Sequence, residues 1–191
     1  MQWRFITLTT LVLLAAFSRI VPHLPNFSPL NAIALFAAAY FARQYQAFLV
    51  PLAATWLSDL FLNNVTYAQP GQGFLWFYPG FYWQYLAYAL IVLWGIYLLH
   101  GRVSFLRTVV GVFGGGVIFF LVSNFGVWIS GSLYPQNLDG LIACYIAALP
   151  FYRRTLAGDV VFSALLFGGF QVLQHYLPAL QRPTAADKAG V

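Results

Sequence analysis

The sequence contains very little charge. Among its 191 residues are nine Lys or Arg and four Asp, with no Glu, and charged residues make up 7% of the chain. A soluble domain carries about a quarter of its residues as charges, so too few are present here to cover a surface that faces water. With 61% hydrophobic residues and a mean hydropathy of +0.76, the chain is predicted to be an integral membrane protein in contact with the lipid bilayer.

Patterns typical of metal centres and of most enzymes are also missing. The one cysteine, Cys144, excludes an internal disulfide and any site built on a cysteine pair. The sequence has no phosphate-binding glycine loop, no nucleophile elbow and no pair of carboxylates with a nearby base. The three histidines, His23, His100 and His175, fall on opposite sides of the predicted topology, which excludes one shared metal site. We therefore expect neither an enzyme nor an ATPase, and neither a cofactor nor a metal.

What the chain does contain is a series of apolar segments. A helix that crosses the bilayer needs about 20 residues. Six segments qualify or nearly qualify, at residues 5–21, 30–41, 46–62, 81–100, 104–129 and 155–177. No small-residue cleavage site precedes Ser18, so we expect the first segment to be retained as a span. Residues 1–181 are thus predicted to form a single six-helix transmembrane domain, and residues 182–191 a polar cytoplasmic tail.

The most unusual stretch, residues 18–41, joins the first two segments. Pro22, Pro25 and Pro29 interrupt the helix there, because proline removes a backbone donor and blocks helix continuation. Non-helical backbone at membrane depth is tolerated where protein or a water-lined cavity satisfies it. The stretch is therefore either a helix connector or one wall of a site. The polar side chains available to build it are His23, Asn26 and Ser28.

The basic residues predict the orientation, since Lys and Arg mark cytoplasmic connections. With a cytoplasmic N-terminus, the inner segments hold Arg4, Arg43, Arg102, Arg107, Arg182 and Lys188. The outer segments hold Arg153 and Arg154. We expect a multi-pass protein of the bacterial cytoplasmic (inner) membrane with both termini cytoplasmic, and no nucleic-acid partner, because the charges form no patch. The long outer connection at 130–154 is interpreted as carrying a short interfacial helix at 138–149.

This topology places four polar side chains in the outer third of the membrane: Arg19, Asp59, Asn124 and Asp159. A charged group in a spanning helix is expensive in lipid and normally faces the bundle and a partner. We therefore expect Arg19 to pair with Asp59 or Asp159. Three helices contribute to the cluster, which favours a polar cavity open to the outside. The alternative is architectural, with Asp159 at the positive end of the last helix and Arg153 and Arg154 anchoring that helix at the headgroups.

Aromatic residues gather at the same outer level. The segment FLWFYPGFYW at residues 74–83 is mostly aromatic. Others follow along the chain: Trp128, Tyr134, Tyr145 and Tyr152. An interfacial aromatic belt explains part of this set, and a lid that stacks on a ligand is the other interpretation.

Several stretches carry a resemblance to known proteins, namely PNFSPLNAIALFAAAYF, LVPLAATWLSDLF, SNFGVW, YPQNLDGLIACYIAALPFYRRTLAGD and FSALLFG. They resemble a widespread bacterial family of small membrane proteins of unknown function. That family is similar in turn to the substrate-binding S components of energy-coupling factor (ECF) vitamin transporters. The resemblance implies an all-α, six-helix S-component-like bundle with a vitamin-sized ligand near the outer face. By position it implies that these side chains face the ligand: His23, Asn26, Trp76, Tyr78, Tyr134, Asp139 and Tyr145.

The sequence departs from S components at the surface used for docking. S components that dock on a shared partner usually show Ala-x-x-x-Ala on their first helix, and here that helix offers only Ala15 and Ala16. Ala34 and Ala38 have the spacing but lie on the second segment. Two alternatives therefore stay open. The protein either docks on an ECF energising module or transports its substrate alone, as some cobalamin-specific relatives do.

The function predicted from the sequence is capture of a vitamin-like small molecule, with a corrinoid among the candidates, from the outer side by an S-component-like transporter. The alternative is a structural or accessory subunit of a larger membrane complex. The glycine-rich face at 111–116 supports that reading equally well, because small residues pack helices within one chain or between chains. The predicted substrate-binding residues are Arg19, His23, Asn26, Asp59, Trp76, Tyr78, Asn124, Trp128, Tyr134, Asp139, Tyr145 and Asp159.

Overall fold

The structure is a computed structural model that describes residues 2–131 and 133–181. Its helices are α1 (Gln2–Phe17), α2 (Leu30–Tyr40), α3 (Gln44–Phe61), α4 (Phe81–Leu99), α5 (Phe105–Ser130), α6 (Leu138–Ser163) and α7 (Gly169–Tyr176). Within the described residues no strand is present, which confirms the all-α class. The predicted tail at 182–191 lies outside the described residues.

Five helical segments are long and apolar enough to cross a membrane. They are Gln2–Ile20, Gln44–Thr66, Phe81–Leu99, Phe105–Ser130 and Leu138–Tyr176. The remaining predicted span is α2, which has 11 residues and reaches only about 16 Å at 1.5 Å per residue. Several apolar spans of this kind are compatible with a multi-pass membrane protein.

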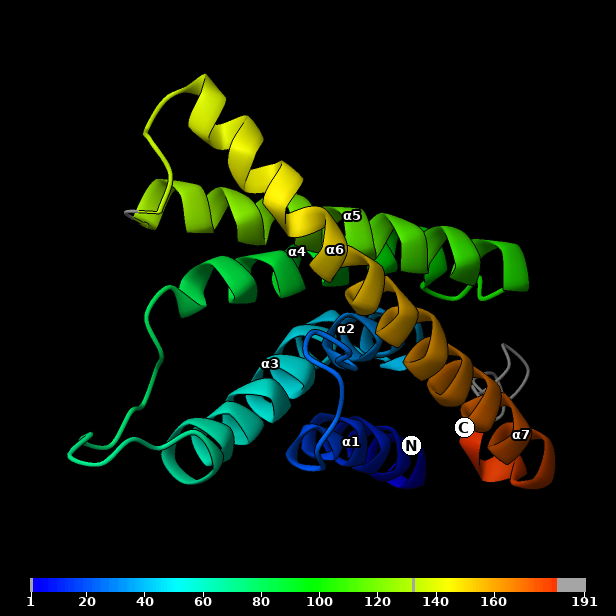
Figure 1. Cartoon of the computed structure of the whole chain (residues 1–191). Coiled ribbons are helices and arrows are strands. Elements are labelled where there is room, and N and C mark those ends of the chain that lie inside the picture. The colour runs from blue at the N-terminus through cyan, green and yellow to red at the C-terminus, as the bar shows by residue number, and fades with distance from the viewer. Residues whose placement is uncertain (1, 132, 182–191) are drawn as a thin grey trace.

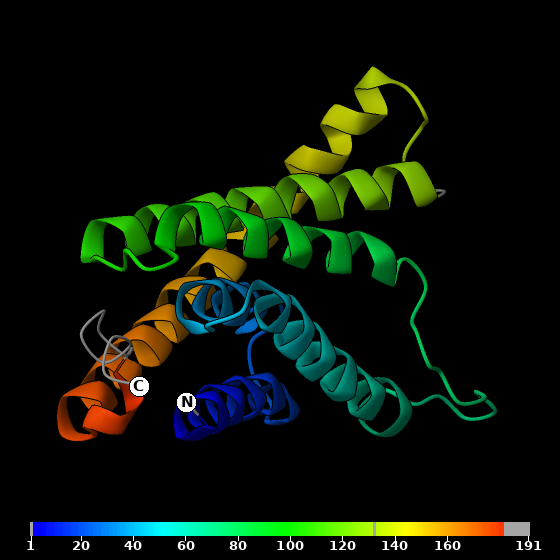
Figure 2. The same ribbon diagram turned by 180° about the vertical axis from the view of Figure 1, so that it is seen from behind.

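Helix α2 forms the centre of the bundle, and every one of its residues is buried. Figure 1 shows α4 and α5 on one side of α2 and α1 on the other, with α6 running obliquely across, and the reverse view in Figure 2 shows the same layers. The alanines of α2 permit close packing: a Cβ added at Gly95 of α4 would lie 2.6 Å from the Cβ of Ala38. A short helix with no lipid-facing surface does not need the length of a spanning helix, which explains why α2 can be so short.

The prediction that the last helix begins at residue 155 after a separate interfacial helix is wrong. Helix α6 begins at Leu138 and continues through a π-helical turn, Ala164–Gly168, into α7, so that one helical segment covers 39 residues. Asn137 caps its start by accepting a hydrogen bond from the backbone N–H of Gly140 at 2.9 Å. The charged pair that suggested a boundary, Arg153 and Arg154, lies exposed within the continuous helix.

The first residues of the chain and residue 180 meet at one end of the bundle (Figure 1). The guanidinium of Arg4 is buried there and donates hydrogen bonds to the backbone carbonyls of Leu180 and of Tyr40, the latter at 3.1 Å. It also lies 5.4 Å from the ring centroid of Phe170. The start of α1, the end of α2 and residue 180 therefore share one side of the bundle. That this side is cytoplasmic remains a prediction from the arginine pattern.

Candidate functional site

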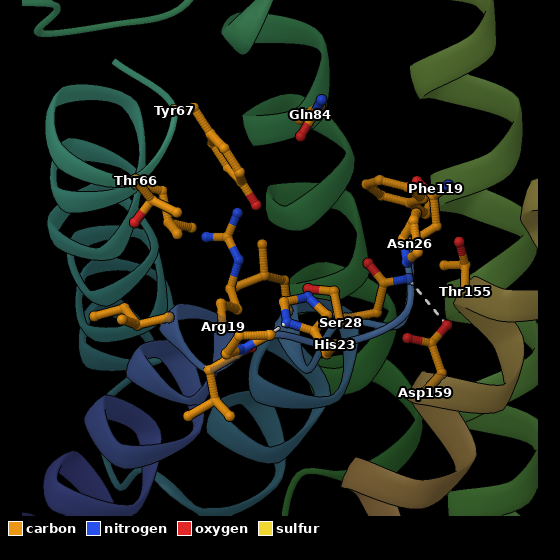
Figure 3. A pocket seen from close by; sticks show the side chains of 17 residues that line it. Arg19, His23, Asn26, Ser28, Thr66, Tyr67, Gln84, Phe119, Thr155 and Asp159 are labelled. Atoms are coloured by element: carbon orange, nitrogen blue, oxygen red, sulfur yellow. Dashed lines mark hydrogen bonds between the residues drawn. The ribbon is translucent and has the colours of Figure 1, made fainter.

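A cavity of about 550 Å³ lies in the half of the bundle away from Arg4. Its walls come from the turn that ends the Gln2–Ile20 segment, the connector between α1 and α2, the start of α2, the turn after α3, and the facing turns of α4, α5 and α6. Figure 3 shows Arg19 on the α3 side of this cavity and Asp159 on the α6 side, with His23 and Ser28 of the connector between them. Four of the predicted site residues line it: Arg19, His23, Asn26 and Asp159.

The connector, residues 21–29, is built around a tight turn. The backbone N–H of Phe27 donates to the carbonyl of Leu24 at 3.0 Å, and Asn26 has a φ of 66°. Proline at the second position of a turn and asparagine in the left-handed region at the third are typical of a type II β-turn, and Pro25 precedes Asn26. The stretch is thus both a helix connector and a wall of the cavity, which were the two readings left open by the sequence.

The turn makes a first testable prediction. Asn26→Val is expected to lower the free energy of unfolding by about 1–2 kcal/mol, because a β-branched residue is strained in the left-handed region that asparagine tolerates. Asn26→Gly is the matched control, since glycine adopts a positive φ without strain. Thermal unfolding of both variants in detergent measures the difference. Equal stability of the Val and Gly variants would show that the turn is not required.

Helix α6 packs against the connector at a glycine. A Cβ added at Gly158 would lie 2.8 Å from the backbone N and 3.1 Å from the backbone O of Ser28. Only glycine allows the backbone of the connector to lie this close to the helix. The same contact brings Asp159, the next residue of α6, to the wall of the cavity beside Ser28.

The predicted pairing of Arg19 with Asp59 is confirmed. The Arg19 guanidinium donates from one nitrogen to Asp59 Oδ1 at 2.7 Å and to Ser58 Oγ at 2.8 Å. The second oxygen of Asp59 accepts from the hydroxyl of Tyr85 at 2.8 Å, and Asp59 is 6% exposed. This ion pair joins the end of α1 to α3, and the Tyr85 hydrogen bond extends it to α4. Asp59 lies behind Arg19 and is not among the residues that line the cavity.

Of the two carboxylates that the sequence left open as the partner of Arg19, Asp159 is not the one used. Its Oδ2 accepts from the Asn31 side-chain amide of α2 at 3.0 Å, and Asp159 is 1% exposed. Its Oδ1 is buried and has no hydrogen-bond partner within the described residues. The Oδ1 of Asn31 and the hydroxyl of Ser28 are also buried and also have no hydrogen-bond partner within the described residues. The cavity therefore has one wall with a satisfied ion pair and another with unsatisfied acceptors.

Tyr78 contributes to the cavity indirectly. Its hydroxyl donates to Oε1 of Gln84 at 2.9 Å, and Gln84 lines the cavity. Burial raises the pKa of Tyr78, and the Asp59 carboxylate raises it further against the opposing effect of Arg19. Tyr78 therefore keeps its proton at neutral pH and holds the Gln84 side chain in place.

Besides Asp59 and Tyr78, six further predicted site residues do not line the cavity: Trp76, Asn124, Trp128, Tyr134, Asp139 and Tyr145. Trp76 is 61% exposed and stacks on Trp56 at 6.4 Å between ring centroids. Asn124 donates to a carbonyl of its own helix, that of Phe120, at 2.8 Å. Trp76 lies on the connection between α3 and α4, and the other five lie on α5, on α6 or on the connection between these two helices. Their contact with a ligand stays a prediction.

The tips of α5 and α6 are held together by two of these residues. The indole N–H of Trp128 donates to the carbonyl of Pro135 at 2.9 Å, and the hydroxyl of Tyr145 donates to that of Leu121 at 2.8 Å. Asp139 is exposed in the first turn of α6, where a carboxylate favours the positive end of the helix. Trp128 therefore ties α5 to the connection that precedes α6, Tyr145 ties α6 to α5, and Asp139 favours the start of α6.

Several cavity residues were not predicted as site residues from the sequence. They are Ser28, Asn31, Thr66, Tyr67, Gln84, Phe119 and Thr155, among others. Asn31 could have been found, since it is the polar residue of an otherwise apolar helix next to Ser28. Thr66 ends a π-helical turn, Leu62–Thr66, which no sequence pattern marks and which often accompanies functional sites.

Comparison with known proteins identifies a family but no activity. A family model described as "Family of unknown function (DUF6580)" matches residues 1–180. No curated protein and no solved structure matches the chain.

Proposed function

We propose that the chain, which belongs to the DUF6580 family of unknown function, captures a vitamin-like small molecule from the outer side of a membrane. It does so as a substrate-binding transporter that resembles the S components of ECF systems. The observation that carries this proposal is the cavity of about 550 Å³, into whose lining the end of the Gln2–Ile20 segment, the connector, α2, the turn after α3, α4 and α6 bring charged or polar residues. Cavities of about 300–1,000 Å³ with a few convergent polar groups are typical of small-molecule sites.

The position of the cavity supports capture from outside. It lies away from the end at which Arg4 joins the start and the end of the described chain. With that end cytoplasmic, as the arginine pattern predicts, the cavity faces the outer side of the bacterial cytoplasmic membrane. The volume favours a ligand of drug size over the corrinoid that the resemblance also allows, because a corrinoid has several times as many atoms as a typical drug.

The same geometry bears on how the protein is energised. Ala34 and Ala38, which have the spacing of the S-component docking motif, are fully buried on α2. They are therefore covered by this chain's own helices and do not present a surface to an energising module. This favours a component that works alone, or one that docks through a different surface.

The test is to purify the protein in mild detergent, extract it and search the extract for a co-purifying metabolite by mass spectrometry. Tryptophan fluorescence is then titrated with the recovered compound and with cobalamin, thiamin, riboflavin, biotin and queuine. Saturable quenching by one organic ligand is the expected result. An empty extract together with no quenching would contradict the proposal, and a stoichiometric protein partner in place of a ligand would favour an accessory subunit.

A further inference from the structure

The wall of the cavity formed by α2, α6 and the connector carries three unpartnered oxygen atoms. They are Oδ1 of Asp159, Oδ1 of Asn31 and Oγ of Ser28, each buried and each without a hydrogen-bond partner within the described residues. Asp159 is 1% exposed and Asn31 3% exposed, and all three residues belong to the lining of the cavity. Buried polar atoms in native proteins almost always find a partner. Three on one wall of one cavity point to a ligand that supplies hydrogen-bond donors.

The charges around the cavity identify the sign of that ligand group. The positive charge of Arg19 is balanced by Asp59, whose Oδ1 lies 2.7 Å from a guanidinium nitrogen. Within the described residues this is the one ion pair. Asp159 has an amide of Asn31 as its hydrogen-bond donor and no cationic side chain among the described residues. A buried carboxylate without a counter-charge is strongly unfavourable. A carboxylate that ionises on the Asp159 wall would therefore need a positive group, and within the described residues no side chain supplies one.

We propose that Asp159 receives a positively charged nitrogen group of the ligand, an inference that rests on the proposed function. A primary ammonium has three N–H donors, which matches the number of unpartnered oxygens on Asp159, Asn31 and Ser28. The ligand class is then an organic cation or amine, with the remainder of the molecule extending toward Arg19 and His23 on the other wall.

The test compares three ring compounds of equal size and different charge: benzylammonium, benzyl alcohol and benzoate. Their binding to the purified protein is measured by tryptophan fluorescence and by the shift of the melting temperature. We expect benzylammonium to bind at least tenfold more tightly than the other two. Asp159→Asn should abolish that preference, and Asp139→Asn, an exposed carboxylate on the same helix, should leave it unchanged.

Folding and binding should respond in opposite ways to Asp159→Asn. The amide keeps the hydrogen-bond acceptor for Asn31 and removes a buried charge, so the variant without ligand should melt at the same temperature as the parent or higher. A purely structural role for Asp159 predicts a lower melting temperature, which would overturn the inference. Should Asp159→Asn fail to fold, Ser28→Ala removes one of the three oxygens and should reduce the benzylammonium preference several-fold.

The outcomes separate this inference from the proposed function. A metabolite that co-purifies with the parent but is neutral or anionic, or a benzylammonium preference that survives Asp159→Asn, overturns the inference and leaves the proposed function standing. If a metabolite is recovered but the three compounds bind equally or not at all, the inference is likewise overturned and the proposed function stands. Absence of any metabolite and of any binding contradicts both.

Discussion

Arg19→Ala is expected to lower the free energy of unfolding by about 3 kcal/mol, the lower end of the effect of removing one partner of a buried ion pair, because the Arg19 side chain is 17% exposed. Asp59 is 6% exposed and would lose both its counter-charge and the 2.7 Å hydrogen bond to the guanidinium. Tyr85 would remain as its donor, which is too little to stabilise a carboxylate in a low-dielectric site. The variant should express poorly and melt well below the parent.

Two further variants make this prediction specific. In Arg19→Ala/Asp59→Asn the uncompensated charge is removed, so part of the lost stability should return. Arg153→Ala is the control, because Arg153 is exposed on α6 and its removal should leave the melting temperature unchanged. If Arg19→Ala melts like the parent, Arg19 extends to the outer headgroups instead, and the ion pair is not what joins α1 to α3.

Gly158→Ala is expected to lower the free energy of unfolding by about 3 kcal/mol, at the upper end of the range for overpacking. The added Cβ would lie 2.8 Å from the backbone nitrogen of Ser28. A flexible side chain could move away, but this neighbour is backbone in a turn that Pro25 and Pro29 restrict. The connector must therefore separate from α6, which also opens the wall that holds Asp159.

Gly169→Ala is the matched control for this variant. A Cβ at Gly169 would have no neighbour within 4 Å, and alanine is the better helix former by up to about 1 kcal/mol. Thermal unfolding should show Gly158→Ala destabilised and Gly169→Ala equal to the parent or slightly more stable. Equal behaviour of the two variants would contradict the close packing of α6 on the connector.

The helices that the sequence predicted best are those bounded by strong local signals. The start of α2 follows Pro29, and the start of α4 follows Gly80, whose φ of 79° requires glycine or a strained residue. The start of α6 was misplaced because Arg153 and Arg154 suggested a membrane boundary. Two adjacent arginines occur both at a membrane boundary and on the exposed face of a continuous helix. The sequence alone does not distinguish these two arrangements, whereas the packing of α6 on α5 does.

Contacts in the candidate site could be predicted where two residues share one depth in the membrane. Contacts that depend on how the helices pack could not. Arg19, Asp59 and Asp159 share one predicted depth, so topology limited the partner of Arg19 to these two carboxylates, and the structure shows that it is Asp59. The partner of Asp159 is Asn31, 128 positions away in the chain, and no local signal connects them. The aromatic residues of the outer connections were assigned to a ligand by position in the resemblance, yet the cavity is lined mainly by the connector and by polar residues of the helices.

The most direct test of a small-molecule site in this cavity is ligand occupancy, measured by native mass spectrometry of the parent and two tryptophan variants. Thr155 lines the cavity, whereas Ala157, two residues later on α6, is exposed. Thr155→Trp fills the cavity, and Ala157→Trp adds the same side chain outside it. We expect the parent and Ala157→Trp to carry one bound organic molecule and Thr155→Trp to fold without it. A ligand retained by Thr155→Trp, or absent from all three proteins, would contradict a small-molecule site in this cavity.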